Sequence, residues 1–373
     1  MKPMFATGKI NRRIALLATL IVAGELVCTQ HTLAQATGYL VTDLSGNDST
    51  QVLSRLNNLG DVVGRAVGGV EGQTQATFWS HSGLRKKLLG VFAAGDYSSA
   101  SAINDIGEVA GASNTAKGIV PFLWTAKGGL KRVPLLSGDS CGQAASINRY
   151  GHVVGYSSGQ SGTRAFLWAR SGGLRRLGPL PGGNYSKARD VNDGDEVAGT
   201  SGSGAGNRAV LWTNTGTVAD LGTLPGDYAS EAMAINNDGD VVGYSNGPHG
   251  MRAFLWTKTA GIQDLGVLPG GDSSRALAIS DSGEVVGSSN SASGDHAFIW
   301  TKQTGMVDLN SATSANLGVM LIEAHAINSK GQIIVMGRDM HEGDMDSAPG
   351  SGDNQYCAVA PPATFLLTPT TTP

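Results

Sequence analysis

The stretch AMAINNDGDVVGYSNGPHGMRAFLWTKTAGIQDLGVLPGG, residues 232–271, determines the fold class. It is predicted to hold four short strands separated by glycine-rich turns and loops, at 232–235, 240–245, 252–257 and 262–268. Pro269 ends the last of them, since proline donates no hydrogen bond to a strand ladder. Four short strands in about 44 residues form the unit of a β-propeller blade.

The third of these strands distinguishes a propeller from an open sheet. Ala253, Phe254, Leu255 and Trp256 are consecutive apolar residues, so both faces of the strand are expected to be buried. In a sheet with one solvent-exposed face, apolar and polar residues would alternate along the strand. A propeller blade lies between two neighbouring blades, so both of its faces are buried. The coils of a β-helix are shorter than this repeat, so the pattern favours a propeller over a solenoid.

Two residue types mark seven copies of the repeat. Six tryptophans follow one another at intervals of 45, 44, 44, 44 and 44 residues: Trp79, Trp124, Trp168, Trp212, Trp256 and Trp300. A turn asparagine preceded by an aliphatic residue recurs with them, and a serine replaces it in the sixth copy: Asn57, Asn104, Asn148, Asn192, Asn236, Ser280 and Asn328. The sequence therefore predicts an all-β, seven-bladed β-propeller with four-stranded antiparallel blades.

The ends of the repeat region predict how the ring closes. Residues 39–44 align with the fourth strand of a repeat, and the last strand, at 365–368, aligns with a third strand. The N-terminal strand is therefore expected to complete the last blade, which would remove two exposed sheet edges. The propeller domain is predicted at 37–369, with an insertion at about 337–362 and a Thr/Pro tail at 370–373.

Residues 1–36 have the pattern of a secretory signal peptide, with a basic start, an apolar run and the cleavage motif Ala34-Gln35-Ala36. Cleavage near Ala36 is expected to leave a secreted protein, extracellular or periplasmic, without a transmembrane segment. The whole chain has a net charge of −3, and loss of this basic segment makes the mature chain more acidic. That balance disfavours nucleic acid as a partner.

The mature chain contains two cysteines, Cys141 and Cys357. Export permits a disulfide bond between them, because such bonds persist in oxidising compartments. Two free thiols are the alternative, and the sequence leaves both open.

The repeat resembles a known family. The segment His296-Ala297-Phe298-Ile299-Trp300 is similar to the motif of the HAF family of extracellular repeat proteins, and Arg164–Trp168 and Arg252–Trp256 are related forms of it. The resemblance covers nearly the whole mature chain. It implies a bacterial, exported, repeat-built protein, and it carries over no catalytic residue.

Candidate ligand-binding residues lie in the loops that precede the first strand of a repeat. Loops on a rigid scaffold often carry binding residues, and tyrosines beside polar groups can stack on and hydrogen-bond to sugars. The candidates are Asp96, Tyr97, Asn184, Tyr185, Asp227, Tyr228 and Asp272. Ordinary loop chemistry is the alternative reading of these residues.

The motifs favour binding over catalysis. No Gly-x-Ser-x-Gly elbow opens a predicted helix and no phosphate loop is present, so neither catalytic residues nor a cofactor are predicted. The acidic insertion fits no metal-ligand spacing, so no metal site is predicted. Two hypotheses remain: a secreted, non-catalytic binding or adhesion module with a polysaccharide or another surface protein as partner, or a glycan-active enzyme with carboxylates near the central channel.

The predicted outermost strands segregate charge. Early blades carry basic residues there, and later blades carry acidic ones: Lys86, Lys87, Lys131, Arg132, Arg175 and Arg176 against Asp220, Asp264, Asp308 and Asp43. Charges on outer strands discourage edge-to-edge pairing. The alternative is that the basic arc binds an acidic partner.

Overall fold

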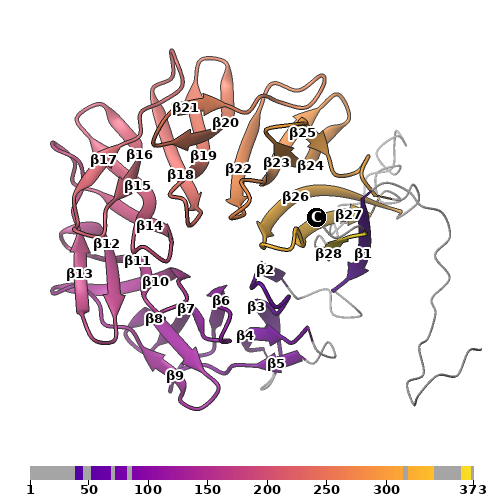
Figure 1. The fold of residues 1–373 in the computed structure, drawn as a ribbon. Coiled ribbons are helices and arrows are strands. Elements are labelled where there is room, and N and C mark those ends of the chain that lie inside the picture. Colours follow the sequence, from indigo (N-terminus) through magenta and orange to yellow (C-terminus); the bar gives the residue numbers. More distant parts are fainter. Residues whose placement is uncertain are drawn as a thin grey trace, which may run out of the picture. The chain divides into compact units, whose positions relative to one another are not determined.

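The structure is a computed structural model that describes residues 38–44, 52–68, 72–81, 86–313, 318–339 and 363–370. These residues all belong to one unit of the chain, Ala36–Pro373. They form seven four-stranded antiparallel sheets, which surround a common centre as the blades of a propeller (Figure 1). The predicted all-β, seven-bladed fold is confirmed.

Six blades follow the chain from the innermost strand to the outermost. Blade 1 is β2 (Val52–Leu56), β3 (Val62–Val67), β4 (Thr74–Trp79) and β5 (Lys86–Leu88). Blade 2 is β6 (Ser98–Ile103), β7 (Val109–Thr115), β8 (Gly118–Thr125) and β9 (Gly129–Arg132). Blade 3 is β10 (Asp139–Ile147), β11 (Val153–Gly159), β12 (Gly162–Ala169) and β13 (Gly173–Leu177). Blade 4 is β14 (Ser186–Val191), β15 (Val197–Ser203), β16 (Gly206–Trp212) and β17 (Val218–Asp220). Blade 5 is β18 (Ala229–Ile235), β19 (Val241–Gly247), β20 (Gly250–Thr257) and β21 (Gly261–Asp264). Blade 6 is β22 (Ser274–Ile279), β23 (Val285–Ser291), β24 (Gly294–Thr301) and β25 (Gly305–Asp308).

Blade 7 combines the two ends of the repeat region. It contains β26 (Val319–Ile327), β27 (Ile333–Asp339), β28 (Ala363–Pro369) and, as its outer strand, β1 (Tyr39–Asp43). β1 pairs antiparallel with β28, from Tyr39 opposite Pro369 to Asp43 opposite Phe365. That this pairing holds the ring closed stays a prediction. The predicted insertion lies mostly outside the described residues.

Several strand boundaries in the fifth repeat differ from the prediction, and β18 starts three residues early, at Ala229. β19 runs to Gly247 and β20 starts at Gly250, so most of the predicted loop at 246–250 belongs to the strand ladder. β21 ends at Asp264, four residues early. Leu265 beyond it still donates to the carbonyl oxygen of Ala253 (3.0 Å) and is buried between blades 5 and 6.

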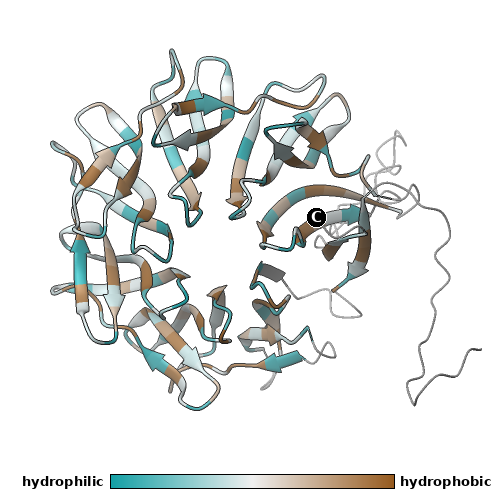
Figure 2. Cartoon of the chain, in the orientation of Figure 1, coloured by the Kyte–Doolittle hydropathy of each residue, from teal (hydrophilic) through white to brown (hydrophobic). Residues whose placement is uncertain are grey.

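The third strand of each blade contributes to two different interfaces. Ala253 and Leu255 pack with Phe298 of blade 6, whereas Phe254 between them packs with Leu211 of blade 4. The consecutive apolar residues of β20 are thus buried on both faces, as predicted. Figure 2 shows the complementary pattern on the outer strands β5 and β13, which are largely hydrophilic.

The channel has two chemically different ends. The turns between the first and second strands, which contain the marker asparagines, lie at what we call the turn end. In an antiparallel meander, the loops that enter the first strand and those that join the second and third strands lie at the opposite end. We call this the loop end.

A ring of asparagine side chains joins the blades at the turn end. Each side-chain amide donates from Nδ2 to the backbone carbonyl oxygen of the corresponding residue in the next blade, at 3.0–3.3 Å. The bonds run from Asn57 to Asn104, Asn104 to Asn148, Asn148 to Asn192, Asn192 to Asn236, Asn236 to Ser280 and Asn328 to Asn57. The last of them joins blade 7 to blade 1.

The same side chains also shape their own turns. Oδ1 of Asn57 accepts hydrogen bonds from the backbone N–H groups of Leu59 (3.0 Å) and Asp61 (2.8 Å). Sequence reasoning assigned the asparagines to turn chemistry alone and missed the bond to the next blade. Ser280 interrupts the ring, because its short hydroxyl accepts from the N–H of Glu284 (3.1 Å) within its own turn.

Serines join the blades at the loop end. The hydroxyl of Ser230, at the start of an inner strand region, accepts from the N–H of Ala209 in the preceding blade (2.9 Å) and donates to Gly222 (2.6 Å). Three equivalent serines make the same pair of bonds: Ser98, Ser186 and Ser274. At these four junctions, adjacent blades are therefore hydrogen-bonded at both ends of the channel.

We predict that deleting residues 38–44 destabilises the whole propeller. The deletion leaves β28 as an open edge and removes Leu44, which is buried between blades 7 and 1. We expect the melting temperature to fall by about 10 °C or more, since each kcal/mol is worth about 2–4 °C in domains of 150–250 residues. Deletion of residues 371–373 is the control. An unchanged melting temperature for the first deletion would contradict closure by β1.

We predict that Ser280→Asn stabilises the protein by completing the asparagine ring. The new amide would donate to the carbonyl oxygen of Asn328, and a buried hydrogen bond of this kind contributes about 0.5–1.5 kcal/mol. The free energy of unfolding in urea measures the effect. Ser282→Asn, at an exposed position of the same turn, is the control. Equal stabilities of the two variants would count against the ring as a source of stability.

Candidate functional site

The central channel contains two cavities. At the turn end, a cavity of about 200 Å³ is lined by the asparagine ring and by Asp190. A second cavity of about 270 Å³ lies among the inner strands of blades 1 to 5. We call it the channel cavity. Its lining residues are Arg55, Ser99, Ala100, Ser101, Gln143, Ala144, Ala145, Tyr156, Lys187, Ala188, Arg189 and Met233.

A β-bulge in each inner strand directs side chains toward the channel. In β14 the register shifts between Ala188 and Asp190, so Arg189 is the extra residue, and in β18 the shift lies around Met233. Comparable shifts occur in the other inner strands. The bulged Arg189 and Met233 both line the channel cavity.

A glycine in the second strand makes room for the bulge. In blade 4 a Cβ on Gly199 would lie only 2.2 Å from the carbonyl oxygen of Lys187, and in blade 5 one on Gly243 would lie 1.9 Å from that of Glu231. Only glycine permits so close an approach of two backbones. The recurrent Val-Val-Gly or Val-Ala-Gly segments, as at 241–243 and 197–199, are therefore the sequence signal of the bulge.

Asp190 and Arg55 separate the two cavities. Asp190 accepts hydrogen bonds from Ser146 Oγ (2.6 Å) in blade 3 and from the N–H of Ile235 (3.0 Å) in blade 5. Arg55 donates from Nη1 to the carbonyl oxygen of His325 in blade 7, at 2.6 Å. Burial raises the pKa of Asp190 and lowers that of Arg55, and the attraction between the two charges opposes both shifts.

Three half-buried tyrosines lie near the channel cavity. Nζ of Lys187 lies 4.2 Å from the centre of the Tyr156 ring, within cation–π distance. Tyr244 stands opposite Glu231 in the ladder between β18 and β19, and burial together with this carboxylate raises its pKa to about 12. Burial, reinforced by Glu231, also raises the pKa of Tyr185. We call Tyr156, Tyr185 and Tyr244 the tyrosine rim.

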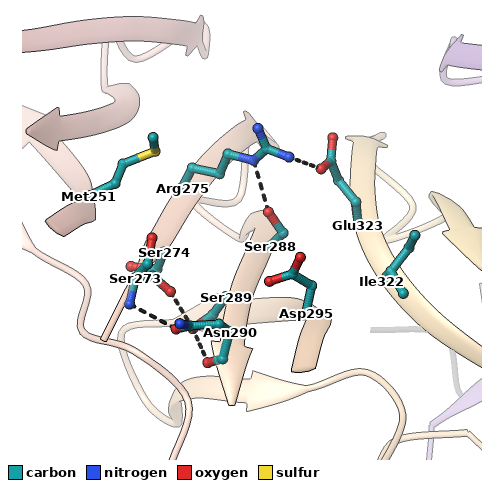
Figure 3. Close-up of a pocket in the computed structure, with 10 residues that line it drawn as sticks. All are labelled: Met251, Ser273, Ser274, Arg275, Ser288, Ser289, Asn290, Asp295, Ile322 and Glu323. Atoms are coloured by element: carbon teal, nitrogen blue, oxygen red, sulfur yellow. Dashed lines mark hydrogen bonds and ion pairs between the residues drawn. The ribbon is translucent and has the colours of Figure 1, made fainter. Parts of the chain in front are cut away.

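A further cavity, of about 230 Å³, lies between the inner strands of blades 6 and 7 (Figure 3). Arg275 crosses it, donating from Nε to Ser288 Oγ at 3.0 Å and forming an ion pair with Glu323 of blade 7. The only basic residue in this lining is thus neutralised by a carboxylate in the same lining, within the part of the chain that the structure describes.

Two of the residues predicted to bind a ligand take part in loop structure. Asp96 Oδ1 accepts from Asn114 Nδ2 at 2.5 Å, and Asp272 Oδ1 accepts from Asn290 Nδ2 at 2.6 Å. Tyr97 lies beside blade 1, where Arg65 donates to its hydroxyl at 3.3 Å.

The other predicted residues lie in the loops before blades 4 and 5. Asn184 is exposed, whereas Tyr185 belongs to the tyrosine rim. Tyr228 is 61% exposed, and Asp227 is half-buried with its Oδ2 enclosed. The structure therefore groups only Tyr185 with the charged residues of the channel, and the ligand-binding role of this set stays a prediction.

Sequence reasoning missed most of the channel residues. Tyr156 and Tyr244 both follow the Val-Val-Gly segment, in the pentapeptide Val-Val-Gly-Tyr-Ser. Lys187 and Arg189 occupy inner-strand positions whose direction depends on the bulge. The pentapeptide was the available signal, because it places a tyrosine directly after the glycine that accommodates the bulge.

The predicted disulfide stays untested. Cys141 lies in β10, and its half-buried Sγ lies 3.7 Å from the carbonyl oxygen of Ser158. Cys357 lies outside the described residues.

The outer strands bear the predicted charges, but the acidic arc is largely paired within its own blades. Asp264 forms an ion pair with Arg252 at 3.0 Å, and Asp308 accepts from His296 Nδ1 at 2.6 Å. Ser293 lies 3.1 Å from the other ring nitrogen of His296, which aligns a serine, a histidine and an aspartate. Because blades 4 and 5 have Arg–Asp pairs at these positions, the histidine takes the place of a structural cation.

Comparison with known proteins supports the fold. The structure is similar to virginiamycin B lyase from Staphylococcus aureus, with a TM-score of 0.52 and 13% identity over 88% of this chain and 98% of that chain. It is also similar to an acylaminoacyl peptidase from Pyrococcus horikoshii, with a TM-score of 0.50 and 12% identity over 79% of this chain and 50% of that chain. TolB from Acinetobacter baumannii gives a TM-score of 0.46 and 15% identity over 67% of this chain and 63% of that chain.

At these identities the similarity shows the propeller fold alone, since one fold supports many functions. No family model matches the chain, and no curated protein matches it. A search of the described residues for a helix long and apolar enough to cross a membrane finds none.

We predict that Gly199→Ala destabilises blade 4 and displaces the bulge that carries Arg189. The new methyl group would collide with the carbonyl oxygen of Lys187, and relief of such overpacking costs about 1–3 kcal/mol. Unfolding in urea measures the loss. The control is Gly202→Ala on the same strand, where the nearest atom to a new Cβ lies at 3.5 Å. Equal stabilities of the two variants would contradict this account of the bulge.

Proposed function

We propose that this protein is an exported, non-catalytic binding module that takes a carbohydrate at the loop end of its channel. The observation that carries the proposal is the tyrosine rim beside charged inner-strand residues. Aromatic faces with polar neighbours suit a sugar, which presents apolar C–H faces and a periphery of hydroxyl groups. Tyr156 and Tyr185 stand beside Lys187 and Glu231, which supply hydrogen-bonding groups of both kinds.

Export and family membership belong to the same proposal. The N-terminal 36 residues have the sequence pattern of a signal peptide, and the His-Ala-Phe-Ile-Trp repeat resembles the HAF family. Both features agree with a protein that meets glycans outside the cytoplasm.

A glycan-active enzyme has less support. Such an enzyme needs one carboxylic acid and one carboxylate that are free to act on the same bond. Asp190 has the raised pKa that suits an acid, but hydrogen bonds from Ser146 and Ile235 occupy both of its oxygens. Glu231 faces Arg189 at 3.5 Å, and Glu323 is paired with Arg275.

Binding of the purified protein to an array of polysaccharides and oligosaccharides tests the proposal. We expect binding to at least one glycan class and a tenfold or greater loss in a Tyr156→Ala/Tyr185→Ala variant, since about 1.4 kcal/mol corresponds to tenfold. Tyr150→Ala is the matched control, because Tyr150 is 53% exposed at the turn end. The control should bind like the unaltered protein.

Three outcomes would overturn the proposal. They are the absence of glycan binding, binding that the double variant retains, and turnover of the bound glycan. If the purified protein binds a surface protein and no glycan, the proposed carbohydrate ligand is wrong and the partner is a protein.

A further inference from the structure

The channel cavity has an excess of positive charge. Its lining includes three basic side chains, those of Arg55, Lys187 and Arg189, and no carboxylate among the described residues. The cavity between blades 6 and 7 provides an internal comparison, because Arg275 there is paired with Glu323. A concave site lined by one sign of charge concentrates ions of the opposite sign.

Arg189 and Lys187 leave donors without a protein acceptor in the described part of the chain. Arg189 approaches Glu231 at only 3.5 Å, and its buried Nε has no hydrogen-bond partner within the described part of the chain. A buried donor left without a partner costs about 1–3 kcal/mol. The Lys187 ammonium faces the Tyr156 ring, so its N–H donors meet an aromatic surface.

The nearby carboxylates are not part of the lining, although Glu231 pairs with Arg189 at 3.5 Å. Asp190 lines the other cavity, where Ser146 and the backbone of blades 4 and 5 bind its oxygens. Glu231 lies opposite Tyr244 in the ladder. Burial, followed by repulsion from Arg189, lowers the pKa of Lys187, which is the direction expected for an ammonium in a basic, partly dry site.

Neutral donors complete the lining. Ser99 and Ser101 contribute hydroxyl groups from blade 2, Gln143 contributes an amide from blade 3, and Tyr156 contributes a phenol. At about 270 Å³ the cavity is slightly smaller than the range of about 300–1,000 Å³ that is typical of sites for drug-sized ligands. Its size and its donors suit a small oxyanion carried on one sugar unit.

We propose that the channel cavity binds the anionic group of the ligand, a carboxylate, sulfate or phosphate, between Lys187 and Arg189. Charge-assisted hydrogen bonds from the guanidinium and ammonium hold the oxyanion, and the buried Nε of Arg189 gains an acceptor. That a sugar carries this anion rests on the proposed function. Together the two proposals select acidic glycans, with a uronate or a sulfated or phosphorylated sugar at the site, over neutral ones.

Calorimetric titration of the purified protein with four probes tests the site: sodium glucuronate, inorganic sulfate, inorganic phosphate and neutral glucose. We expect binding of at least one anion and none of glucose. A Lys187→Gln/Arg189→Gln variant should bind that anion at least tenfold more weakly, since hydrogen bonds to charged groups contribute about 1.5–3 kcal/mol.

The matched control is Lys127→Gln/Lys302→Gln, which removes the same charge from exposed turns between the third and fourth strands of blades 2 and 6. It should bind like the unaltered protein. Thermal unfolding adds a readout that needs no variant, because a ligand bound only by the folded state raises the melting temperature of the unaltered protein. Glucuronate or another anion should do so, and glucose should not.

The outcomes separate the two proposals. Absence of anion binding, or equal loss in both double variants, would overturn the anion site. Binding of neutral glycans alone, with the channel variant unaffected, would overturn the anion site and leave the proposed function intact. Binding of phosphate or sulfate in a protein that recognises no glycan would support the anion site and overturn the proposed function.

Discussion

The hydrogen bond from an asparagine side chain to the backbone of the next blade is the constraint on which the ring depends. Donor and acceptor belong to the same position in consecutive repeats, so asparagine makes the same bond in six of the seven blades, and Ser280 interrupts the series in blade 6. The bond from Asn328 to Asn57 spans 271 positions of the sequence. It is nevertheless chemically identical to the bonds between neighbouring repeats. The turn end therefore closes with its own repeated contact. At the outer edge of blade 7, β1 pairs with β28.

With the inner strands held in place, the β-bulge decides which side chains face the channel. The repeat assigns fixed residues to the framework: asparagine in the turn, serine at the loop end and glycine opposite the bulge. The bulged position itself is free to vary, and it holds Arg189 in blade 4 and Met233 in blade 5. A residue that recurs in every copy serves the framework that all blades share. Residues that recognise one particular ligand have to stand at positions that differ between copies. The basic residues that line the channel cavity stand at such positions.

This division explains how far the sequence predicted the structure. Strand order, blade number and the two-sided burial of β20 follow from spacing and local pattern, because six of the seven blades are each built from one continuous segment. The channel cavity combines side chains from five blades, so it exists only once the ring has formed. The candidate ligand-binding residues in the loops were predicted from their residue type alone. Asp96 and Asp272 have the chemistry of ligand-binding residues, but each is hydrogen-bonded to an asparagine of the adjacent strand, a contact that local sequence does not reveal.

Part of the charge asymmetry of the channel arises at a single position of the repeat. At intervals of 44 residues the inner strands carry Ser99, Gln143, Lys187, Glu231 and Arg275. From blade 4 onward the signs alternate, and Arg275 meets a carboxylate of the following blade in Glu323. Lys187 stands where the alternation begins, with neutral Gln143 on one side, and the bulged Arg189 adds a second positive charge on the same strand. An alternating ring satisfies its own charges. The neutral residues of blades 2 and 3 interrupt it, so the excess positive charge is confined to one side of the channel, where an anion from outside the chain would meet the least competition from the protein's own carboxylates.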